Sequence, residues 1–211
     1  MNNDNVYAER LTADNSVLAM IDHQTGLLVS CRDYDPHLLK ANIRGLCTLA
    51  KTVGLPSVVT ASMPQGPNGP IMPDILEILG DEVIERPGEI NAWDNPAFKG
   101  AIEKTGRKKI VMAGVVTDVC LLFPAISAVA DGYDVYAVID ASGTWNKSVQ
   151  EISLHRMTQA GVKVSTWASV LAELMNDWRS EKGMALGGVL GEHTSYRWVY
   201  DSFLAANENS K

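Results

Sequence analysis

The sequence predicts an α/β protein with a three-layer α/β/α, Rossmann-like fold around a six-stranded parallel sheet, and we expect the strand order 3-2-1-4-5-6. Two observations favour this class. Short apolar runs typical of buried strands alternate with segments whose apolar residues recur at helical spacing. In addition, the two kinds of segment follow one another along the chain, as in parallel strands joined by right-handed helical crossovers.

The first half of the chain is expected to hold three strands and three helices. The strands are SVLAMID (16–22), PSVVTAS (56–62) and EVIER (82–86). Residues 36–54 have one apolar helical face and end at Gly54, and residues 74–80 form a shorter helix. The third helix begins at Asn95, a capping residue followed by proline, and closes at Gly106.

The second half repeats the pattern. The remaining expected elements are the strands KKIVMAGVV (108–116), YDVYAVID (133–140) and VKVSTW (162–167), and the final core helix 169–179. A helix over residues 119–132 is expected to kink at Pro124, which lacks a backbone donor. Another helix over residues 148–161 is expected to begin with a capping box formed by Ser148 and Glu151.

Composition excludes several classes of protein. The chain has 211 residues, of which 46% are hydrophobic and 20% charged, and its net charge is −7. An acidic chain of this kind lacks the basic surface that nucleic acids and anionic membranes require, so we expect neither partner. Three widely spaced cysteines without a CxxC pair argue against a disulfide framework or zinc site, and the polar start favours a cytoplasmic protein.

We expect one catalytic domain over residues 1–182 and a C-terminal tail over residues 183–211. The tail carries several glycines followed by an aromatic-rich helical segment, YRWVYDSFLAA. Aromatic residues beyond the sixth β-α unit exceed what the core needs. The tail is therefore predicted to pack on its own core or on a neighbouring subunit, and the protein to be a homo-oligomer.

Reactive side chains follow the predicted strands. Asp22 ends the first strand, Arg86 ends the third, and Cys120 follows the fourth. The carboxyl ends of parallel strands meet at one edge of the sheet, where α/β proteins bind their ligands. A cysteine in the first turn of a helix is also expected to have a lowered pKa. These residues therefore predict a site that combines a carboxylate, a cation and a thiol.

Each of these residues also has a structural interpretation. Cys120 can be a small core residue, Asp22 a helix or turn cap, and Arg86 a surface ion-pair residue. Other catalytic patterns are missing, since the chain has no GxGxxG, no phosphate-binding GxxxxGK[ST] loop and no GxSxG elbow. We therefore expect no nucleotide cofactor and no serine nucleophile.

Three segments resemble the isochorismatase-like cysteine hydrolases: DHQTGLL (22–28), ERPGEINAWDNPAF (85–98) and GVVTDVC (114–120). The resemblance covers about residues 16–180 in order. Three shorter segments resemble the YcaC-type branch of that family: GPNGP (66–70), RPGEINAWDN (86–95) and DASGT (140–144). The resemblance implies a hydrolase on a six-stranded parallel sheet and, for this branch, a homo-oligomer of high order such as an octamer.

The family uses an Asp-Lys-Cys triad. The resemblance gives Asp22 the role of base and Cys120 the role of nucleophile, while Arg86 occupies the lysine position. It also implies an oxyanion hole formed by the backbone amides of Val116 and Cys120, with a cis peptide between Val115 and Val116. The nicotinamidase branch binds metal through an Asp-x-His motif after its second strand. The corresponding stretch here has neither residue, so no metal is expected.

These roles predict cleavage of an amide C–N bond of a small molecule through an acyl-thioester on Cys120, without a cofactor. Isochorismate cleavage itself, a reaction of a vinyl ether on this fold, does not use a cysteine nucleophile. Each candidate substrate-binding residue could equally be a packing residue. The candidates are Gln24, Asn91, Trp93, Phe123, Trp145 and Asn146. Arg86 keeps an alternative open, namely a non-catalytic oligomeric scaffold or small-molecule-binding protein with a relic site.

Overall fold

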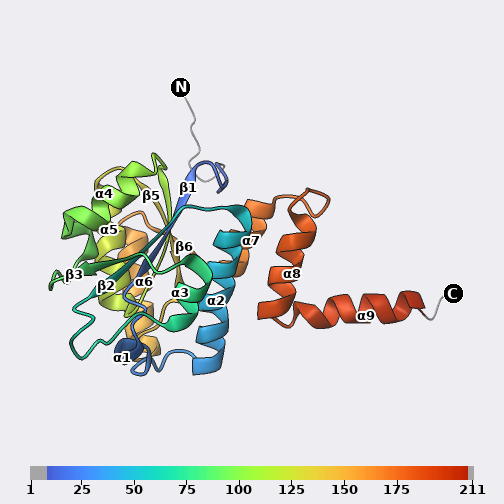
Figure 1. Cartoon of the computed structure of the whole chain (residues 1–211), viewed down its shortest axis with the longest axis horizontal. Helices are drawn as coiled ribbons and strands as arrows, with labels where there is room; N and C mark the ends of the chain where they lie inside the picture. Colours follow the sequence, from blue (N-terminus) through green and yellow to red (C-terminus); the bar gives the residue numbers. More distant parts are fainter. Residues whose placement is uncertain (1–8, 209–211) are drawn as a thin grey trace.

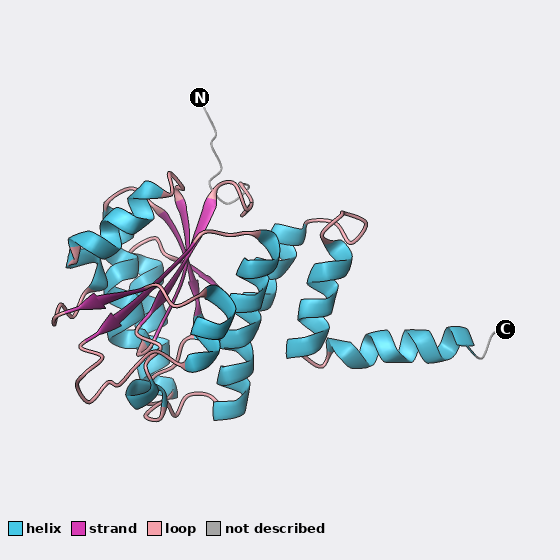
Figure 2. Cartoon of the chain, viewed as in Figure 1, coloured by secondary structure: helices cyan, strands magenta, loops and turns pink. Residues whose placement is uncertain are grey.

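The computed structural model describes residues 9–208, which form one sheet between two layers of helices (Figures 1 and 2). The strands are β1 (Ser16–Ile21), β2 (Ser57–Ser62), β3 (Val83–Arg86), β4 (Lys109–Gly114), β5 (Asp134–Val138) and β6 (Lys163–Ser165). Their order across the sheet is β3-β2-β1-β4-β5-β6, and each neighbouring pair is parallel. The predicted fold class and strand order are confirmed.

The central strand β1 is buried along its whole length because helices cover both faces of the sheet. Leu18 and Met20 join one core cluster, whereas Val17, Ala19 and Ile21 join the other. The first cluster includes residues of α2 (Pro36–Val53), α3 (Pro73–Leu79), α7 (Trp167–Met175) and α8 (Gly183–His193). The second includes residues of α4 (Pro96–Lys104), α5 (Leu122–Ala130) and α6 (Lys147–Gln159).

Capping residues decide where the helices begin and end. Asp35 accepts hydrogen bonds from the first turn of α2, and that helix ends at Gly54 with a left-handed φ of 69°. The capping box predicted from Ser148 and Glu151 is wrong. Asn146 caps α6 instead, because its side chain accepts a hydrogen bond from the Val149 amide and Ser148 is already helical.

Two further boundaries differ from the sequence prediction. The helix predicted to start at residue 169 begins at Trp167, capped by Thr166, and ends at Met175, since Asn176 adopts a left-handed φ of 61°. The kink predicted at Pro124 is replaced by a π-helical turn over Thr117–Leu121 that precedes α5. Pro124 lies in the first turn of α5, where an α-helix leaves its backbone amides unpaired in any case.

The segment after residue 182 forms two helices with different surroundings. Leu186 and Val189 of α8 are buried in the core cluster that α2 also joins. The last helix, α9 (Tyr196–Glu208), extends away from the sheet and its helices (Figure 1). None of the helices within residues 9–208 is long and apolar enough to cross a bilayer.

Candidate active site

The carboxyl ends of β1, β3 and β4 bring the three predicted site residues to one edge of the sheet. Asp22 directly follows β1, and its amide donates to the Thr60 carbonyl of β2 at 2.9 Å. Arg86 is the last residue of β3 and pairs in register with Ser62 of β2. Cys120 lies in the π-helical turn that follows β4. This convergence of carboxylate, cation and thiol is the one that the strand pattern predicts.

Asp22 has an unusual backbone conformation. Its φ is 56°, in the left-handed region that few residues with a Cβ adopt, although aspartate does so more readily than most. The turn is tight, since the Gln24 amide donates to the Asp22 carbonyl at 2.6 Å. The strand thus ends abruptly at Asp22, and such backbone conformations are frequent at functional sites.

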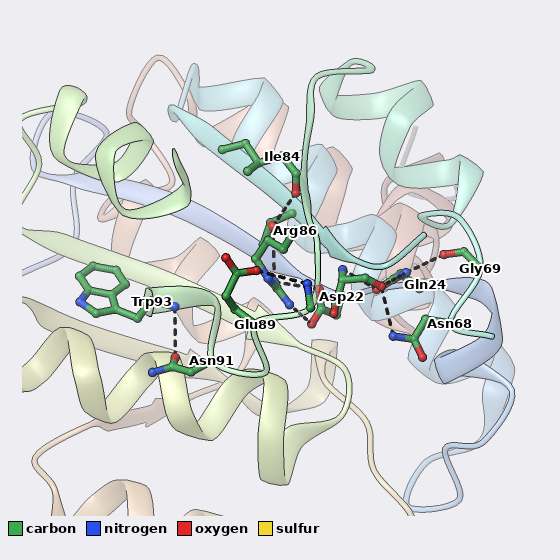
Figure 3. A network of polar contacts seen from close by, with 12 residues as sticks. Asp22, Gln24, Asn68, Gly69, Ile84, Arg86, Glu89, Asn91 and Trp93 are labelled. Atoms are coloured by element: carbon green, nitrogen blue, oxygen red, sulfur yellow. Dashed lines mark hydrogen bonds and ion pairs between the residues drawn. The ribbon is translucent and has the colours of Figure 1, made fainter. Parts of the chain in front are cut away.

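Asp22 and Arg86 form a buried, bidentate ion pair (Figure 3). Arg86 Nη1 donates to Asp22 Oδ1 at 3.0 Å, and Nη2 donates to Oδ2 at 2.7 Å. The Arg86 side chain is 0% exposed and the Asp22 side chain is 1% exposed. Thr60 Oγ1 lies 3.4 Å from Arg86 Nη1 and donates to the Ile84 carbonyl at 2.7 Å. The guanidinium is therefore held rigidly against the carboxylate.

Burial dominates the protonation behaviour of Asp22 and Cys120. The pKa of Asp22 is raised from 3.8 to about 6 because desolvation outweighs the opposing effects of Arg86 and of a hydrogen bond with Cys120. Desolvation and the negative charge of Asp22 also raise the pKa of the Cys120 thiol. The lowered pKa predicted from the helix-start position of Cys120 is therefore wrong. The resting site holds a thiol beside a carboxylate that can accept its proton.

The turn that carries Cys120 is packed closely against the end of β4. The Cys120 amide donates to the Val116 carbonyl at 2.8 Å, and the Leu121 amide approaches the same oxygen at 3.3 Å. A Cβ at Gly114 would lie 2.9 Å from the Leu121 nitrogen, so only glycine fits there. The peptide between Val115 and Val116 is cis, as the family resemblance implies.

A network of hydrogen bonds that the sequence did not predict braces the same turn. Asp118 accepts from the Thr144 hydroxyl at 2.7 Å, and the Thr144 amide donates to Asp33 at 2.8 Å. Gln150 of α6 donates to the other oxygen of Asp33 at 3.0 Å. The only sequence signals were the segments GVVTDVC and DASGT, which carry Asp118 and Thr144 without indicating that the two residues meet.

Gln24 was predicted to bind substrate, and its polar atoms instead contact the loop after β2. Its amide nitrogen donates to the carbonyls of Ser62 and Gly69, at 3.0 and 2.6 Å, and its oxygen accepts from the Ser62 amide at 3.0 Å. The side chain is fully buried. These contacts make Gln24 a brace for the loop (Figure 3).

The structure does not bring the Asn91 and Trp93 side chains to the Asp22 carboxylate (Figure 3). Asn91 caps a short turn and donates to Ser127, whereas Trp93 is buried in the helical layer and donates to Asp131 at 2.8 Å. The other three candidates lie near the π-helical turn or at the start of α6. Phe123 is half-buried with the Arg156 guanidinium 5.7 Å from its ring centre, Trp145 is 44% exposed, and Asn146 caps α6.

His23, Cys31 and Cys47 lack the paired thiol and carboxylate that distinguish the candidate triad. His23 is fully buried, pairs with the Ala141 carbonyl at 2.9 Å, and has its pKa lowered to about 4 by desolvation. Burial raises the pKa of Cys31 and Cys47 to about 12, and neither has a carboxylate hydrogen-bonded to its thiol. Within residues 9–208, no three histidine, cysteine or acidic side chains are grouped so as to hold a metal ion.

Alkylation of Cys120 by iodoacetamide is expected to show a distinct pH dependence. Asp22 can accept the thiol proton only when ionised, and with a pKa of about 6 its ionised fraction rises roughly tenfold between pH 5 and pH 7 and then levels off. Cys47, without a base, should react in proportion to hydroxide throughout. Peptide mapping over pH 5–8 measures both rates.

At neutral pH, Cys120 should therefore be labelled well before Cys47. The Asp22→Asn variant is the control and should lose the plateau. If the Cys120 rate in the unaltered protein rises tenfold per pH unit up to pH 8, as expected for Cys47, Asp22 does not act as its base.

Comparisons with known proteins place the chain in a family. A family model described as the Isochorismatase domain matches residues 16–169. The probable hydrolase YcaC of Escherichia coli K12 is 44% identical over 178 residues, which are 83% of this chain and 86% of that protein. At 20% identity and a TM-score of 0.78, a MAR1 ribonuclease from Caenorhabditis elegans shares the fold.

Two solved YcaC structures match almost the whole chain. The protein from Pseudomonas aeruginosa is 43% identical with a TM-score of 0.89, covering 93% of this chain and 98% of that one. The E. coli protein, an octameric hydrolase of unknown specificity, is 42% identical with a TM-score of 0.90, covering 93% and 97%. From the extent of these matches, this chain belongs to the isochorismatase family of hydrolases.

Proposed function

We propose that this protein is an amidohydrolase that cleaves a C–N bond of a small molecule through an acyl-thioester on Cys120. The observation that carries the proposal is a buried thiol hydrogen-bonded to a carboxylate whose pKa is raised to about 6. Such a carboxylate is ionised at neutral pH and is more basic than an ordinary aspartate. The P. aeruginosa YcaC structure contains covalent acrylamide, an electrophile that combines with thiolates, which supports a reactive cysteine in these proteins.

Acylation begins when the Cys120 thiol passes its proton to Asp22. The sulfur then attacks the carbonyl carbon of the amide and forms a tetrahedral adduct. Collapse of the adduct breaks the C–N bond, and the leaving amine takes the proton back from Asp22. The product of this half-reaction is a thioester between the acyl group and Cys120, with Asp22 ionised again.

The oxyanion of the adduct needs backbone donors. The Cys120 amide is partly engaged, since it donates to the Val116 carbonyl at 2.8 Å. The Val116 amide donates no hydrogen bond within the described residues, which supports its role as the other donor. One such donor is worth about 10²–10³ in rate.

Deacylation uses the same carboxylate. Asp22 removes a proton from water, the resulting hydroxide adds to the thioester, and the acid leaves as the proton returns to the Cys120 sulfur. Arg86 neither gives nor takes a proton in either half-reaction. Its role is that of a fixed positive charge that limits how far burial raises the pKa of Asp22. It occupies the position where the resemblance implies a lysine.

The substrate is expected to be small. Cys120 is only 8% exposed and Asp22 and Arg86 are each 1% exposed, so access to the sulfur is narrow. Phe123, Trp145 and Asn146 remain proposed substrate contacts, since they lie near the Cys120 turn or on the loop that Thr144 anchors to Asp118. We further propose that the protein works in the cytoplasm as a homo-oligomer, since the similar E. coli YcaC is an octamer.

One observation favours a second candidate, a small-molecule-binding or scaffold protein without turnover. Arg86 donates a hydrogen bond to each oxygen of Asp22, so the carboxylate has fewer free lone pairs than a single contact with lysine would leave. This bidentate ion pair would slow proton transfer from Cys120 to Asp22 without preventing ligand binding. The two candidates differ in whether the bound amide is consumed.

The deciding experiment measures acid and amine release from a panel of small amides, with and without a chelator. The unaltered protein is expected to hydrolyse at least one amide whether or not the chelator is present. Cys31→Ala, which removes a different buried thiol, should match it, whereas Asp22→Asn should be inactive. Binding of amides by calorimetry without any product would overturn the hydrolase in favour of the binding protein. Chelator-sensitive turnover restored by zinc or manganese would overturn the metal-free mechanism.

A further inference from the structure

We propose that α9 is an exchange arm: the α9 helix of one copy docks into the groove between α8 and α9 of a second copy, and the contact is reciprocal. This inference concerns a surface remote from Cys120 and does not depend on the chemistry there. It builds on the proposed homo-oligomer by naming the segment that joins two copies and the surface that receives it.

The arm is held at a fixed angle before any partner binds. The rings of Trp178 and Tyr196 stack with centroids 5.7 Å apart and planes 11° from parallel. A Cβ at Gly187 would lie 3.1 Å from the Trp178 ring, so glycine lets that ring lie against α8. The Thr194 hydroxyl donates to the Leu190 carbonyl at 2.6 Å and accepts from the Tyr196 amide at 3.1 Å. Helix α9 therefore cannot fold back onto its own sheet without breaking the Trp178–Tyr196 stacking and the Thr194 hydrogen bonds.

The exposed face of α9 is apolar. Val199, Tyr200, Phe203 and Leu204 fall on one side at helical spacing, and their exposure runs from 42% for Leu204 to 63% for Phe203. A helix of 13 residues is marginal in water without a packed apolar face. The helix projects from the body of the protein (Figure 1), so a partner must supply the packing surface.

The exposed apolar area is a large share of what a stable contact needs. Taking about 200 Å² for a fully exposed aromatic side chain, Trp178, Tyr200 and Phe203 together expose roughly 330 Å². Met184, which is 87% exposed, Val199 and Leu204 add to this surface. A standard interface buries about 800 Å² on each partner, whereas the largest apolar patch on a typical monomer is about 300–600 Å².

The groove beside α9 fits a helix of this kind. Its volume is about 330 Å³, and its lining combines glycines of α8 with Trp178, Met184 and Tyr200. A Cβ at Gly188 would meet nothing within 4 Å, so the floor is open to an approaching helix. Since groove and apolar face lie side by side on one chain, two copies satisfy both at once through a two-fold contact.

Charges at the rim suit the same arrangement. Arg197 lines the groove and pairs with Asp201 of its own helix at 2.9 Å, with both side chains more than half exposed. In an antiparallel, two-fold contact between α9 helices, Arg197 of each copy lies near Asp201 of the other. The contact then carries no uncompensated charge, which favours a second copy over an unrelated partner.

The first test measures particle mass by light scattering for the full-length protein. Phe203→Asp, which places a charge in the apolar face, is expected to lower the mass at least twofold. Ser202→Asp adds the same charge to the same helix outside that face and should leave the mass unchanged. A monomeric unaltered protein, or an equal loss of mass in both variants, would overturn the proposal.

The second test traps the contact. Copies carrying Gly188→Cys are mixed with copies carrying Leu204→Cys and oxidised, and a disulfide-linked dimer is expected on a non-reducing gel. Mixing Gly188→Cys with Ser202→Cys is the control and should give little cross-link. If the mass falls in Phe203→Asp but the first mixture yields no more dimer than the control, the arm docks elsewhere and the groove is not its receptor. Binding of the unaltered protein to neutral lipid vesicles as a monomer would assign the face to a membrane and also refute the proposal.

Discussion

Arg86→Met is expected to lower stability and to abolish turnover, whereas Arg86→Lys should keep much of both. Methionine leaves the buried Asp22 carboxylate without its bidentate partner, and breaking a buried ion pair on one side typically destabilises a protein by about 3–5 kcal/mol. Lysine keeps the charge but makes fewer contacts. Urea unfolding gives the stability, and kcat/KM on the amide identified from the panel gives the activity.

The loss should depend on pH in a defined direction. The pKa of Asp22 is already raised above its ordinary value, and removing Arg86 raises it further, because Arg86 opposes the desolvation. A protonated Asp22 needs no counter-charge, so Arg86→Met should be least destabilising near pH 5 and most destabilising near pH 8.

Lys99→Met is the matched control, since Lys99 pairs with Asp131 at the same distance of 2.7 Å but at the surface. It should change stability little at either pH. If Arg86→Met keeps near-native rates, or loses equal stability at pH 5 and pH 8, Arg86 is not the counter-charge of an ionised Asp22. The site then works as a dyad of Asp22 and Cys120.

Cys120→Ala is expected to lower kcat/KM at least about 10³-fold, because it removes the atom that bonds to the acyl group. Cys120→Ser should be nearly as inactive, since the hydroxyl is a weaker acid and a poorer nucleophile in this desolvated position. Circular dichroism should show both variants folded, because each replaces one small buried side chain with another. Retention of more than a tenth of the activity in Cys120→Ala would mean that the reaction does not pass through the sulfur.

The fold was predictable because its signals are local and periodic. β1 reads as an uninterrupted apolar run since both of its faces are buried, and α2 reads as a helix since its core residues recur at helical spacing before Gly54. The first residues of α6 and α7 were not predictable, because several residues compete to cap the start of a helix. Asn146 took that role over Ser148 in α6, and Thr166 caps α7 two residues before the predicted start, through backbone conformations that the sequence does not state.

The site was predictable to the extent that topology fixes it. Asp22 and Arg86 stand at strand ends and Cys120 lies in the turn that follows β4, and parallel strands bring such residues to one edge. The pKa direction of Cys120 was missed because a helix-start argument counts the helix dipole and omits desolvation and the Asp22 charge.

Residue type alone does not tell which role Gln24 and Trp93 have. An amide side chain or an indole beside a motif is equally suited to binding substrate and to bracing the chain. The structure shows Gln24 bonded to the loop after β2 and Trp93 bonded to Asp131. Asp33 and Thr144 were missed for the converse reason, because 111 residues separate two groups that form one hydrogen bond.

The role of Cys120 is tested most directly by acid-quenched mass spectrometry of the protein during turnover of an amide substrate. The expected result is a transient mass increase equal to the acyl group, mapped to the peptide that contains Cys120 and absent from Cys120→Ala. Cys31→Ala should give the same adduct as the unaltered protein. Turnover with no adduct on Cys120, or an adduct on Cys31 or Cys47 instead, would contradict the acyl-thioester mechanism.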